Sequence, residues 1–408
     1  MLALPQRQPM AMAPPRVRVA VVDDSVVVRG LLSRWLSETP AIEVAGTFRS
    51  GREIIEALPM LQPRIILLDL DMPDMDGLTA LPLILSKSPG TRVIVVSSLS
   101  VHGAEMTMRC LMKGATDYLP KPSNHREVST SADFRQALIA KVLAVGGIRA
   151  AMRQQQVPPT PRPTPTPAPA SSSALFARTS SAGRVVARPA PSPASTATHP
   201  GRVSAGIRPL EKTRPKVIVI GASTGGPQAL VSLLSHMPRV ASRIPIVIAQ
   251  HMPPIFGAIF TSHLKQHVGL PACEAAEGKP LKAGAIYLAP GGCHTVIRRK
   301  PDGQMILTML PSEARGPWRP SIDLLFTSAA DCFGADTLAI ALTGMGRDGT
   351  SGAQDLIQRG ANVIVQDEPS SVVWGIPGSI AEAGLAAAQL PPEKLGELAQ
   401  SLVEGNAA

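Results

Sequence analysis

Three aspartates and a lysine in the first third of the chain stand at the ends of apolar, β-branched runs. Asp23 and Asp24 follow VRVAVV, Asp69 lies within RIILLDL, and Lys121 follows DYLP. Carboxylates gathered in one place repel each other unless a cation is bound, and hard oxygen ligands favour Mg²⁺ or Mn²⁺. A lysine suits a phosphoryl group, and an aspartate can accept phosphate as a nucleophile. These residues predict a metal-assisted phosphorylation site; the alternative is that each aspartate only ends a strand or caps a helix.

A glycine-rich turn, GASTGG at residues 221–226, follows the apolar run KVIVI in the last part of the chain. Such a turn between a strand and a helix can cradle a phosphate with its backbone N–H groups. It also fits the G-x-S-x-G pattern, in which a tight turn presents a serine nucleophile above a sheet. The six residues leave both interpretations open.

A serine nucleophile needs a base and an orienting acid. His251 ends the strand-like run after that of Ser223, and Asp348 stands in the glycine-rich turn ALTGMGRDGTSG. A histidine packed against a loop and an aspartate capping a helix are the alternatives. His263 and His267 have metal-ligand spacing but lack an obvious third ligand, so we favour a solvated helix face for them. The other candidates are His236 and His294 for the base, and Asp323, Asp331 and Asp336 for the acid.

Apolar runs that alternate with helical patterns must position these residues. Before residue 150 we expect strands at 17–22, 42–47, 64–70, 92–98 and 117–119, and after residue 212 at 216–221, 244–250, 285–290, 337–344 and 361–366. This alternation predicts two α/β domains, each with a doubly wound parallel sheet whose ligands bind at the carboxyl ends of the strands. Ser97 also ends a predicted strand of the first domain.

A segment rich in Pro, Ala, Ser and Thr separates the two domains. Eleven Lys and Arg and a single acid lie between Arg149 and Lys216, so this stretch carries the whole net charge of +10. Its composition predicts a disordered linker. We expect a disordered arm at 1–15, a first domain at 16–149, the linker at 150–212 and a second domain at 213–401. Because the excess charge forms no stripe on a folded face, nucleic acid is not an expected partner.

Four separate cysteines (Cys110, Cys273, Cys293 and Cys332) form no C-x-x-C pair, which argues against a zinc or disulfide framework. No run is long enough to span a bilayer, and the first residues lack the apolar core of a signal peptide. We therefore expect a cytoplasmic protein.

The first domain resembles the receiver domain of bacterial two-component response regulators. The resemblance rests on VVDDSVVVR, LLDLDMPDMDGL, VVSS and DYLPKP, from about Val17 to Gly147. It implies a flavodoxin-like fold that binds Mg²⁺ and is phosphorylated on Asp69 by a histidine kinase. It also implies metal ligation by Asp23, Asp24 and Asp69, a cis Lys121–Pro122 peptide, and switch roles for Ser97, Tyr118 and Lys121.

The second domain resembles the catalytic domain of the chemotaxis protein-glutamate methylesterases. The motifs GASTGGPQAL, QHMPPIF, YLAPGGCHTVI, RPSIDLLF, ALTGMGRDGTSGA and QDEPSSVVWGIPGSI run in that family's order. The resemblance favours the nucleophile over the phosphate cradle. It implies a Rossmann-like esterase domain with Ser223 as nucleophile, His251 as base and Asp348 as orienting acid. The Thr224 and Met345 N–H groups would bind the oxyanion, and the reaction would need no cofactor.

The two resemblances together imply a phosphorylation-regulated hydrolase. Its expected substrates are methylated glutamates, and certain glutamines, of methyl-accepting chemotaxis receptors; it would reach the membrane only through them. GIPGSI stands where GMPRAA is more usual in the family, which puts contacts made by that Met or Arg in doubt. The rival class is a response regulator whose second domain binds a nucleotide at GASTGG. Such a domain would require an acidic ribose-binding residue after the next strand, but Gln250 and His251 occupy that place.

Overall fold

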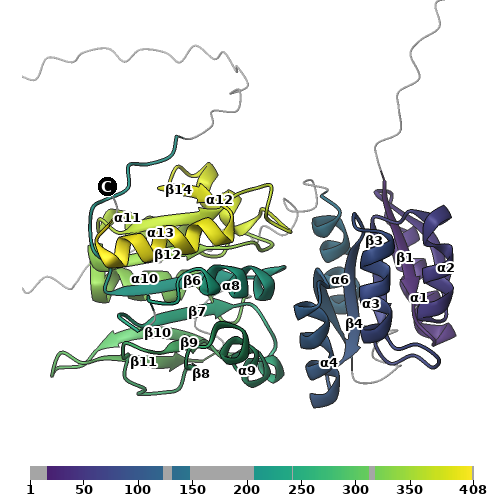
Figure 1. Ribbon diagram of the computed structural model, residues 1–408, viewed down its shortest axis with the longest axis horizontal. Helices are drawn as coiled ribbons and strands as arrows, with labels where there is room; N and C mark the ends of the chain where they lie inside the picture. The colour runs from purple at the N-terminus through teal and green to yellow at the C-terminus, as the bar shows by residue number, and fades with distance from the viewer. Residues whose placement is uncertain (1–15, 123–130, 148–205, 241, 312–317, 407–408) are drawn as a thin grey trace, which may run out of the picture. The chain divides into compact units, whose positions relative to one another are not determined.

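The computed structural model describes residues 16–122, 131–147, 206–240, 242–311 and 318–406. Within these ranges the chain forms two α/β domains, each built around its own parallel sheet (Figure 1). The predicted fold class of both domains is thereby confirmed. The predicted arm and nearly all of the predicted linker lie outside the described residues. No helix of the described part is long and apolar enough to cross a membrane.

The first domain contains a five-stranded sheet in the order β2-β1-β3-β4-β5, with every pair parallel. The inner strands β1, β3 and β4 are almost fully buried between the two faces, as in other doubly wound sheets, whereas the edge strand β2 has a single buried residue. The chain moves from β1 to β2 on one side and then to β3 on the other, so the switch point lies between β1 and β3. The strands are β1 (Val17–Val22), β2 (Ile42–Phe48), β3 (Ile65–Asp69), β4 (Arg92–Ser98) and β5 (Asp117–Lys121).

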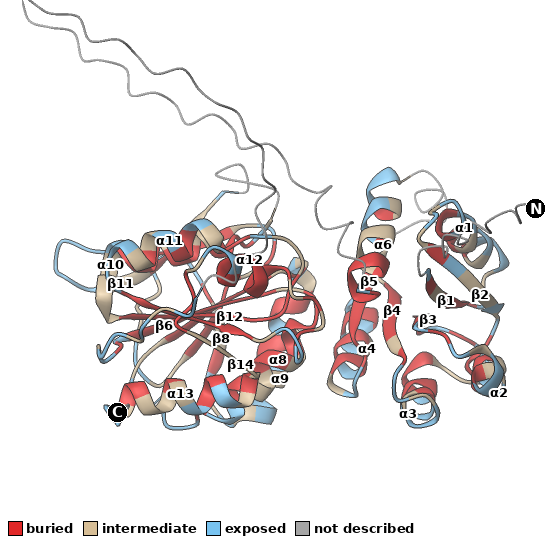
Figure 2. Cartoon of the chain, turned by 90° about the horizontal axis from the view of Figure 1, so that it is seen from above, coloured by how far each residue is buried: buried red, intermediate tan, exposed pale blue. Residues whose placement is uncertain are grey.

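Helices cover both faces of this sheet. Helices α1 and α6 pack together on one face, and α2, α3 and α4 pack side by side on the other (Figure 2). The Ser or Asp side chain before each helix accepts a backbone N–H of its first turn, which fixes where the helix begins. The helices are α1 (Val26–Ser37), α2 (Gly51–Leu61), α3 (Gly77–Lys87), α4 (Val101–Met112) and α6 (Ala132–Val145).

The second domain contains a seven-stranded parallel sheet in the order β14-β13-β12-β6-β7-β9-β8. The chain starts at the central strand β6, moves outward through β7, and later returns to β12 on the other side, so the switch point lies between β6 and β12. The strands are β6 (Val217–Ala222), β7 (Ile246–Gln250), β8 (Ala272–Glu274), β9 (Ile286–Leu288), β12 (Thr337–Ala341), β13 (Asn362–Gln366) and β14 (Ala388–Leu390).

The sequence predicted the inner strands of this sheet but not its edges. The edge strands β8 and β14 have three residues each, too few for an alternating or apolar pattern to stand out. An antiparallel hairpin of β10 (His294–Arg299) and β11 (Met305–Leu310) was also not predicted.

Helices again form a layer on each face. Helix α10 packs on α11 and on β6, and α11 packs on α12; α8 packs on α9 and α13 on the opposite face (Figure 2). Apolar residues of α10, α11 and α12 pack against alternate residues of β6, β7, β12 and β13, which makes that half of the core continuous. The elements are α8 (Gly226–Ser235), η1 (Pro254–Phe256), α9 (Gly257–Val268), α10 (Ile322–Phe333), η2 (Gly334–Asp336), α11 (Thr350–Gln358), α12 (Ile376–Glu382) and α13 (Pro392–Glu404).

The residues just before β6 already bind the second domain. The Arg208 N–H donates to the Ala386 carbonyl over 2.9 Å. Glu211 exchanges two hydrogen bonds with the Asn362 side chain, at 2.9 and 2.8 Å. Residues 208–211 therefore run along this domain, although they fall within the linker range that the composition predicts.

The predicted cis peptide at Lys121–Pro122 is wrong. The cis peptide among the described residues is Arg319–Pro320, and β5 continues through Lys121 in extended pairing with Ser98 of β4.

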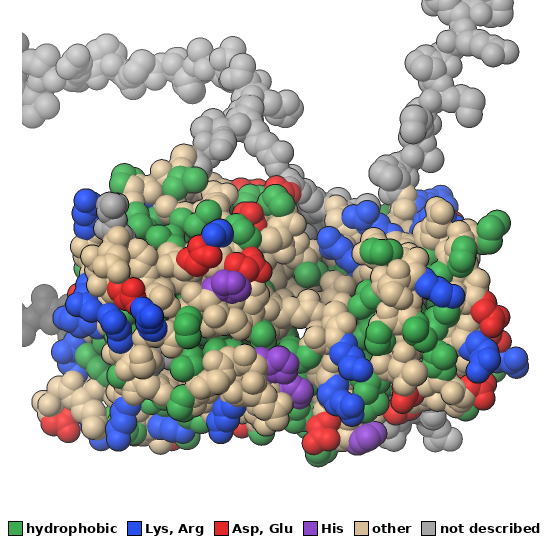
Figure 3. Space-filling view, viewed as in Figure 1, with side chains coloured by type: hydrophobic (Ala, Val, Ile, Leu, Met, Phe, Trp, Pro, Cys, Tyr) green, Lys and Arg blue, Asp and Glu red, His purple; other side chains and the backbone are tan. Residues whose placement is uncertain are grey.

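On the molecular face shown in Figure 3, Lys and Arg side chains are interspersed with acidic, hydrophobic and other side chains.

Candidate active site

Ser223, His251 and Asp348 follow three neighbouring strands of the second sheet. Ser223 follows β6, His251 follows β7, and Asp348 stands in the turn after β12. In the sheet, Gly221 pairs with Ala249 on one side and with Ala341 on the other. The carboxyl ends of β7, β6 and β12 therefore lie next to one another beside the switch point, where ligands bind in doubly wound sheets.

The glycines of GASTGG make the sharp turn at Ser223 possible. Gly225 has φ +77°, a left-handed conformation that costs glycine little. At Gly226 a Cβ atom would come within 2.0 Å of the Gln250 side-chain oxygen and 2.9 Å of the Ala222 Cβ, so any larger residue would displace the Gln250 amide. The Ser223 N–H donates to the Thr343 carbonyl over 3.0 Å, which ties the turn to the loop after β12.

Gln250 connects the turn of the serine to that of the histidine. Its buried side-chain amide donates to the Ser223 carbonyl over 3.0 Å and to the His251 carbonyl over 3.1 Å. The His251 N–H donates to the Ala222 carbonyl over 3.0 Å. These contacts fix the backbones of the two predicted catalytic residues relative to each other.

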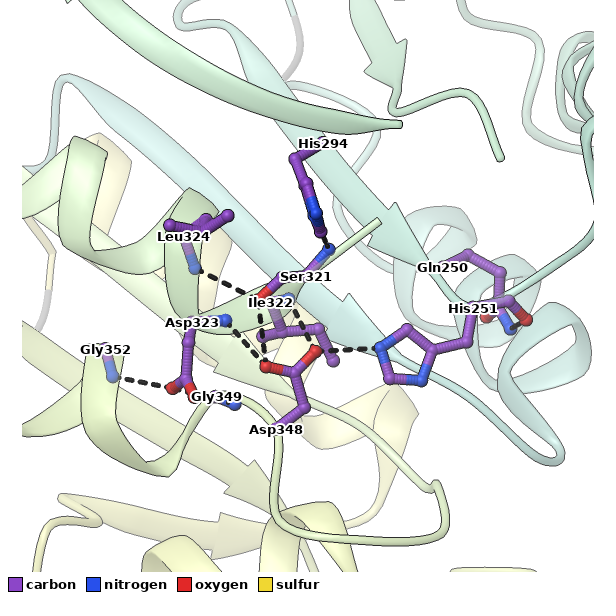
Figure 4. Close-up of polar contacts among 10 residues, drawn as sticks. All are labelled: Gln250, His251, His294, Ser321, Ile322, Asp323, Leu324, Asp348, Gly349 and Gly352. Carbon is purple, nitrogen blue, oxygen red and sulfur yellow. Dashed lines mark hydrogen bonds and ion pairs between the residues drawn. The ribbon is translucent and has the colours of Figure 1, made fainter. Parts of the chain in front are cut away.

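His251 and Asp348 are hydrogen bonded. The His251 Nε2 atom lies 2.9 Å from Asp348 Oδ2, and both side chains are buried (Figure 4). Burial raises the pKa of the Asp348 carboxyl, but the hydrogen bond and charge of His251, with the Asp323 and Ile322 N–H groups, outweigh burial and hold it below its usual value. Asp348 is therefore a carboxylate that fixes one ring nitrogen of His251.

Asp348 also occupies the N-terminus of α10. Its carboxylate accepts the Ile322 N–H at 2.7 Å, the Asp323 N–H at 3.0 Å and the Ser321 hydroxyl at 3.2 Å (Figure 4). The first N–H groups of a helix have no partner within the helix, and the helix dipole favours an anion there. Helix α10 therefore positions Asp348 and stabilises its negative charge.

The other nitrogen of the ring, His251 Nδ1, is buried and accepts no hydrogen bond from the described residues. Ser223 is half-buried on the neighbouring strand end. Of the predicted triad, His251 and Asp348 are thus hydrogen bonded to each other, whereas the hydrogen bond between Ser223 and His251 is not formed. Such bonds are often long or absent without substrate.

The two predicted oxyanion donors flank this edge of the sheet. Thr224 directly follows Ser223, and Met345 follows Gly344, whose backbone packs against Ser223: a Cβ on Gly344 would lie 2.7 Å from the Ser223 Cβ. Within the described ranges, the N–H groups of Thr224 and Met345 donate to no other protein atom.

The remaining candidate histidines and acids do not replace His251 or Asp348 in this pair, although His294 and Asp323 lie close to Asp348 at the start of α10. His263 and His267 stack on α9 with ring centroids 5.9 Å apart, and neither belongs to a potential metal-binding group among the described residues. His236 ends α8, and buried His294 accepts the Ser321 N–H. Asp331 and Asp336 form ion pairs with Arg359 and Lys216, and Asp323 caps α11.

The acidic residues of the first domain converge as predicted from the strand ends. Each of Asp23, Asp24 and Asp69 offers an oxygen within 4.8 Å of the others. Lys121 Nζ lies 2.9 Å from Asp23 and 2.7 Å from Asp69. Burial raises the pKa of Asp69 to about 6, against the lowering effect of Lys121. Three carboxylates this close are a donor set that suits a hard cation such as Mg²⁺.

The predicted switch residues lie on the neighbouring strands. Ser97 is buried at the end of β4, and its hydroxyl lies 2.5 Å from that of Thr107 in α4. Tyr118 is buried in β5, and burial raises its pKa well above the usual value. Lys141 of α6 pairs with Asp117 and lies 5.4 Å from the Tyr118 ring centroid.

Sequence reasoning missed three groups around His251 and Asp348: Gln250, Trp318 and the start of α10. The Pro-Ser pair before IDLLF is a helix-start signal that could have located Ser321. Gln250 precedes His251 directly, but nothing in the sequence shows where its amide points. Trp318 has no local signal, because its contact with His251 joins residues 67 positions apart.

The fold and these residues define a class of protein in which a receiver-like domain is joined to an α/β domain with serine, histidine and aspartate at one sheet edge. Residues 19–133 match the response regulator receiver domain, and residues 218–399 match the CheB methylesterase. The relatives below show the family: the chain belongs to the CheB methylesterases that carry a receiver domain.

Relatives match over nearly the whole chain. A protein-glutamate methylesterase/protein-glutamine glutaminase of Bradyrhizobium diazoefficiens is 42% identical over 96% of this chain and 95% of its own length. One from Rhodospirillum rubrum is 41% identical over 92% of each. Among solved structures, the CheB catalytic domain of Thermotoga maritima is 36% identical, with a TM-score of 0.44 over 46% of this chain and 98% of that one. The receiver domain of Thermotoga maritima CheB is 37% identical, with a TM-score of 0.29 over 33% and 98%.

Proposed function

We propose that this protein hydrolyses γ-glutamyl methyl esters on chemotaxis receptors, releasing methanol, and deamidates specific receptor glutamines. The observation that carries the proposal is the buried hydrogen bond between His251 and Asp348, formed beside the strand end that carries Ser223. Relatives of closely similar length are named for these two activities. The proposed role is adaptation in chemotaxis or a related chemosensory pathway.

In the first step, the Ser223 hydroxyl attacks the side-chain carbonyl carbon of the receptor residue. Its proton passes to His251. Because Asp348 holds Nε2, the nitrogen that accepts the proton is Nδ1. The oxygen of the tetrahedral intermediate takes hydrogen bonds from the Thr224 and Met345 N–H groups, a kind of contact whose loss costs about 10²- to 10³-fold in rate.

In the second step, the C–O bond to methoxide breaks, and His251 Nδ1 returns the proton so that methanol leaves. Water then attacks the acyl-Ser223 ester while His251 Nδ1 takes one of its protons. The bond from the acyl carbon to Ser223 Oγ breaks, and His251 returns the proton to Oγ, which releases glutamate and restores Ser223. Deamidation follows the same path, with ammonia as the leaving group. Asp348 stays ionised throughout and stabilises the protonated ring, as in other triads of this kind.

The first domain is proposed to control this reaction. A chemotaxis histidine kinase supplies the phosphate, Asp69 accepts it, and Asp23, Asp24 and Asp69 hold Mg²⁺. When bound, the ion neutralises charge on the transferred phosphoryl group. We propose that Lys121, which pairs with Asp69, and the Ser97 hydroxyl, which is hydrogen bonded to Thr107, respond to the new charge. We propose that phosphorylation relieves an inhibition of the esterase by the receiver.

Methanol release from methylated receptor membranes tests both parts. Wild-type protein should release methanol faster with acetyl phosphate and Mg²⁺, Asp69→Ala should not respond, and Ser223→Ala should be inactive in either condition. Undiminished release by Ser223→Ala would remove the proposed nucleophile. An equal response of Asp69→Ala and wild type would remove the proposed control while leaving the esterase intact.

A further inference from the structure

The indole ring of Trp318 lies flat against the imidazole ring of His251. The ring centroids are 5.1 Å apart, and the ring planes differ by only 3°. Offset parallel stacking is one of the arrangements that aromatic rings prefer. Such a contact restrains the plane of the histidine ring in a way that a hydrogen bond in that plane does not.

His251 needs this restraint because only one of its nitrogens is held. Nε2 binds Asp348 at 2.9 Å, while Nδ1 accepts no hydrogen bond from the described residues. A single hydrogen bond does not fix the ring plane, because a turn about the N–H···O axis changes neither the distance nor the N–H···O angle. That rotation would move Nδ1, the nitrogen proposed to accept the proton of Ser223. A contact on the face of the ring therefore determines where the base points.

Trp318 is itself placed by its neighbours. It stands three residues before Ser321, which caps α10 and donates to Asp348. Its ring also lies beside Gly346, where an added Cβ would be 3.7 Å from the indole and where φ is +94°. The segment 318–323 thus contacts the base through stacking and the acid through hydrogen bonds.

The stack also suits the charge that His251 takes up during the reaction. When the ring accepts the proton of Ser223 it becomes an imidazolium ion. The face of an indole carries negative charge density and attracts a cation placed over it. The stacking contact is therefore stronger in the protonated state than in the resting state, which favours proton transfer.

We propose that Trp318 is a positioning residue for the base His251, fixing its ring plane and stabilising its protonated form. This inference rests on the proposed function, since it gives Trp318 a role only if His251 is the base. It predicts that an aromatic ring, rather than bulk, is required. Trp318→Phe should retain most of the activity, whereas Trp318→Leu and Trp318→Ala should lose about 10- to 100-fold, the effect expected from a misplaced catalytic group.

The test uses the full-length protein and a fluorophosphonate probe, which reacts with a serine only when its base is in place. The rate of Ser223 labelling, located by mass spectrometry, does not depend on receptor binding. Methanol release in parallel should show a lower kcat with little change in KM. Melting temperatures should be unchanged within a few degrees, and Trp35→Phe in the first domain is the control for loss of a tryptophan elsewhere.

Slow labelling of the Leu and Ala variants with near wild-type labelling of the Phe variant is the expected result. Wild-type rates in Trp318→Leu, or a Phe variant as slow as Ala, would overturn the role of the aromatic ring. A wild-type protein that is not labelled at Ser223 would instead remove the proposed function, and the role of Trp318 with it.

Discussion

Asp323 and Asp348 cap each other's helices. The Asp348 carboxylate accepts the Asp323 N–H at the start of α10, and the Asp323 carboxylate accepts the Gly349 and Gly352 N–H groups at the start of α11, at 3.0 and 2.7 Å. Since Gly349 directly follows Asp348, the second cap also restrains the acid that binds His251. The placement of Asp348 in the proposed triad thus depends on the reciprocal capping of the N-termini of α10 and α11.

Removal of the Asp323 carboxylate should loosen Asp348. We expect Asp323→Ala to destabilise the second domain by about 1 kcal/mol, the usual cost of a lost cap, and to lower methanol release as well. Asp331→Ala is the matched control, because Asp331 lies on the same helix but only forms an exposed ion pair with Arg359. Calorimetry and turnover measure the two effects; equal behaviour of the two variants would contradict the reciprocal capping argument.

The close approach of Gly344 to Ser223 should make this glycine essential. A Cβ at position 344 would lie 2.7 Å from the Ser223 Cβ and 2.6 Å from the Ile376 side chain. We expect Gly344→Ala to displace Ser223 and to lower fluorophosphonate labelling by about 100-fold, as for other misplaced reacting groups. Gly206→Ala, where an added Cβ meets nothing within 4 Å, should label at the wild-type rate. Normal labelling of Gly344→Ala would show that the turn can adjust.

Acid should remove the stabilisation that Asp348 provides. Its pKa is lower in the folded protein than the ordinary value of 3.8, so the folded state binds fewer protons near that pH. The stabilisation is therefore complete above about pH 4 and is lost as the pH falls through the lower, folded-state pKa. Asp348→Asn should melt below wild type at pH 7 and at pH 5 by a similar amount, and the difference should shrink below pH 4. If the difference in melting temperature grew on acidification, folding would raise the pKa of Asp348 rather than lower it.

The Mg²⁺ site predicts a distinction between neighbouring acids of the first domain. Asp24→Ala removes one of three converging carboxylates and should weaken Mg²⁺ binding at least about tenfold, with a parallel loss of phosphorylation by acetyl phosphate. Exposed Asp71, two residues after Asp69, is outside the converging group, so Asp71→Ala is the control. Calorimetric titration with Mg²⁺ alone provides the affinities. Equal affinities for both variants would mean that the acidic surface binds the ion non-specifically.

The strands that position the candidate site could be predicted because continuous apolar, β-branched runs indicate that these strands are buried. Short, continuous β-branched runs such as 217–220 and 246–248 favour buried strands, and polar residues directly after parallel strands are expected at the carboxyl edge of the sheet. Ser223, His251 and Asp348 are predicted as site residues by that argument and by the family motifs. The short edge strands β8 and β14 carry too few residues for such a pattern.

Contacts between distant segments could not be predicted in this way. The capping of α10 by Asp348 and the stacking of Trp318 on His251 depend on where the loop before α10 meets the end of β7. No sequence periodicity or local propensity predicts the contact between this loop and the end of β7, because the contact depends on how the helices pack on the sheet. The sequence therefore predicts Ser223, His251 and Asp348 as site residues, and the structure adds the contacts that hold His251 and Asp348 in place.

The central claim is that Ser223 and His251 act as one catalytic unit. The most direct test measures methanol release by Ser223→Ala, His251→Ala and the double variant, at saturating methylated receptor. Residues that act as a unit are strongly non-additive, so each single variant should lose at least about 10³-fold and the double variant should be hardly slower than either. Effects that multiply in the double variant, or a single variant that keeps most of its turnover, would contradict the account.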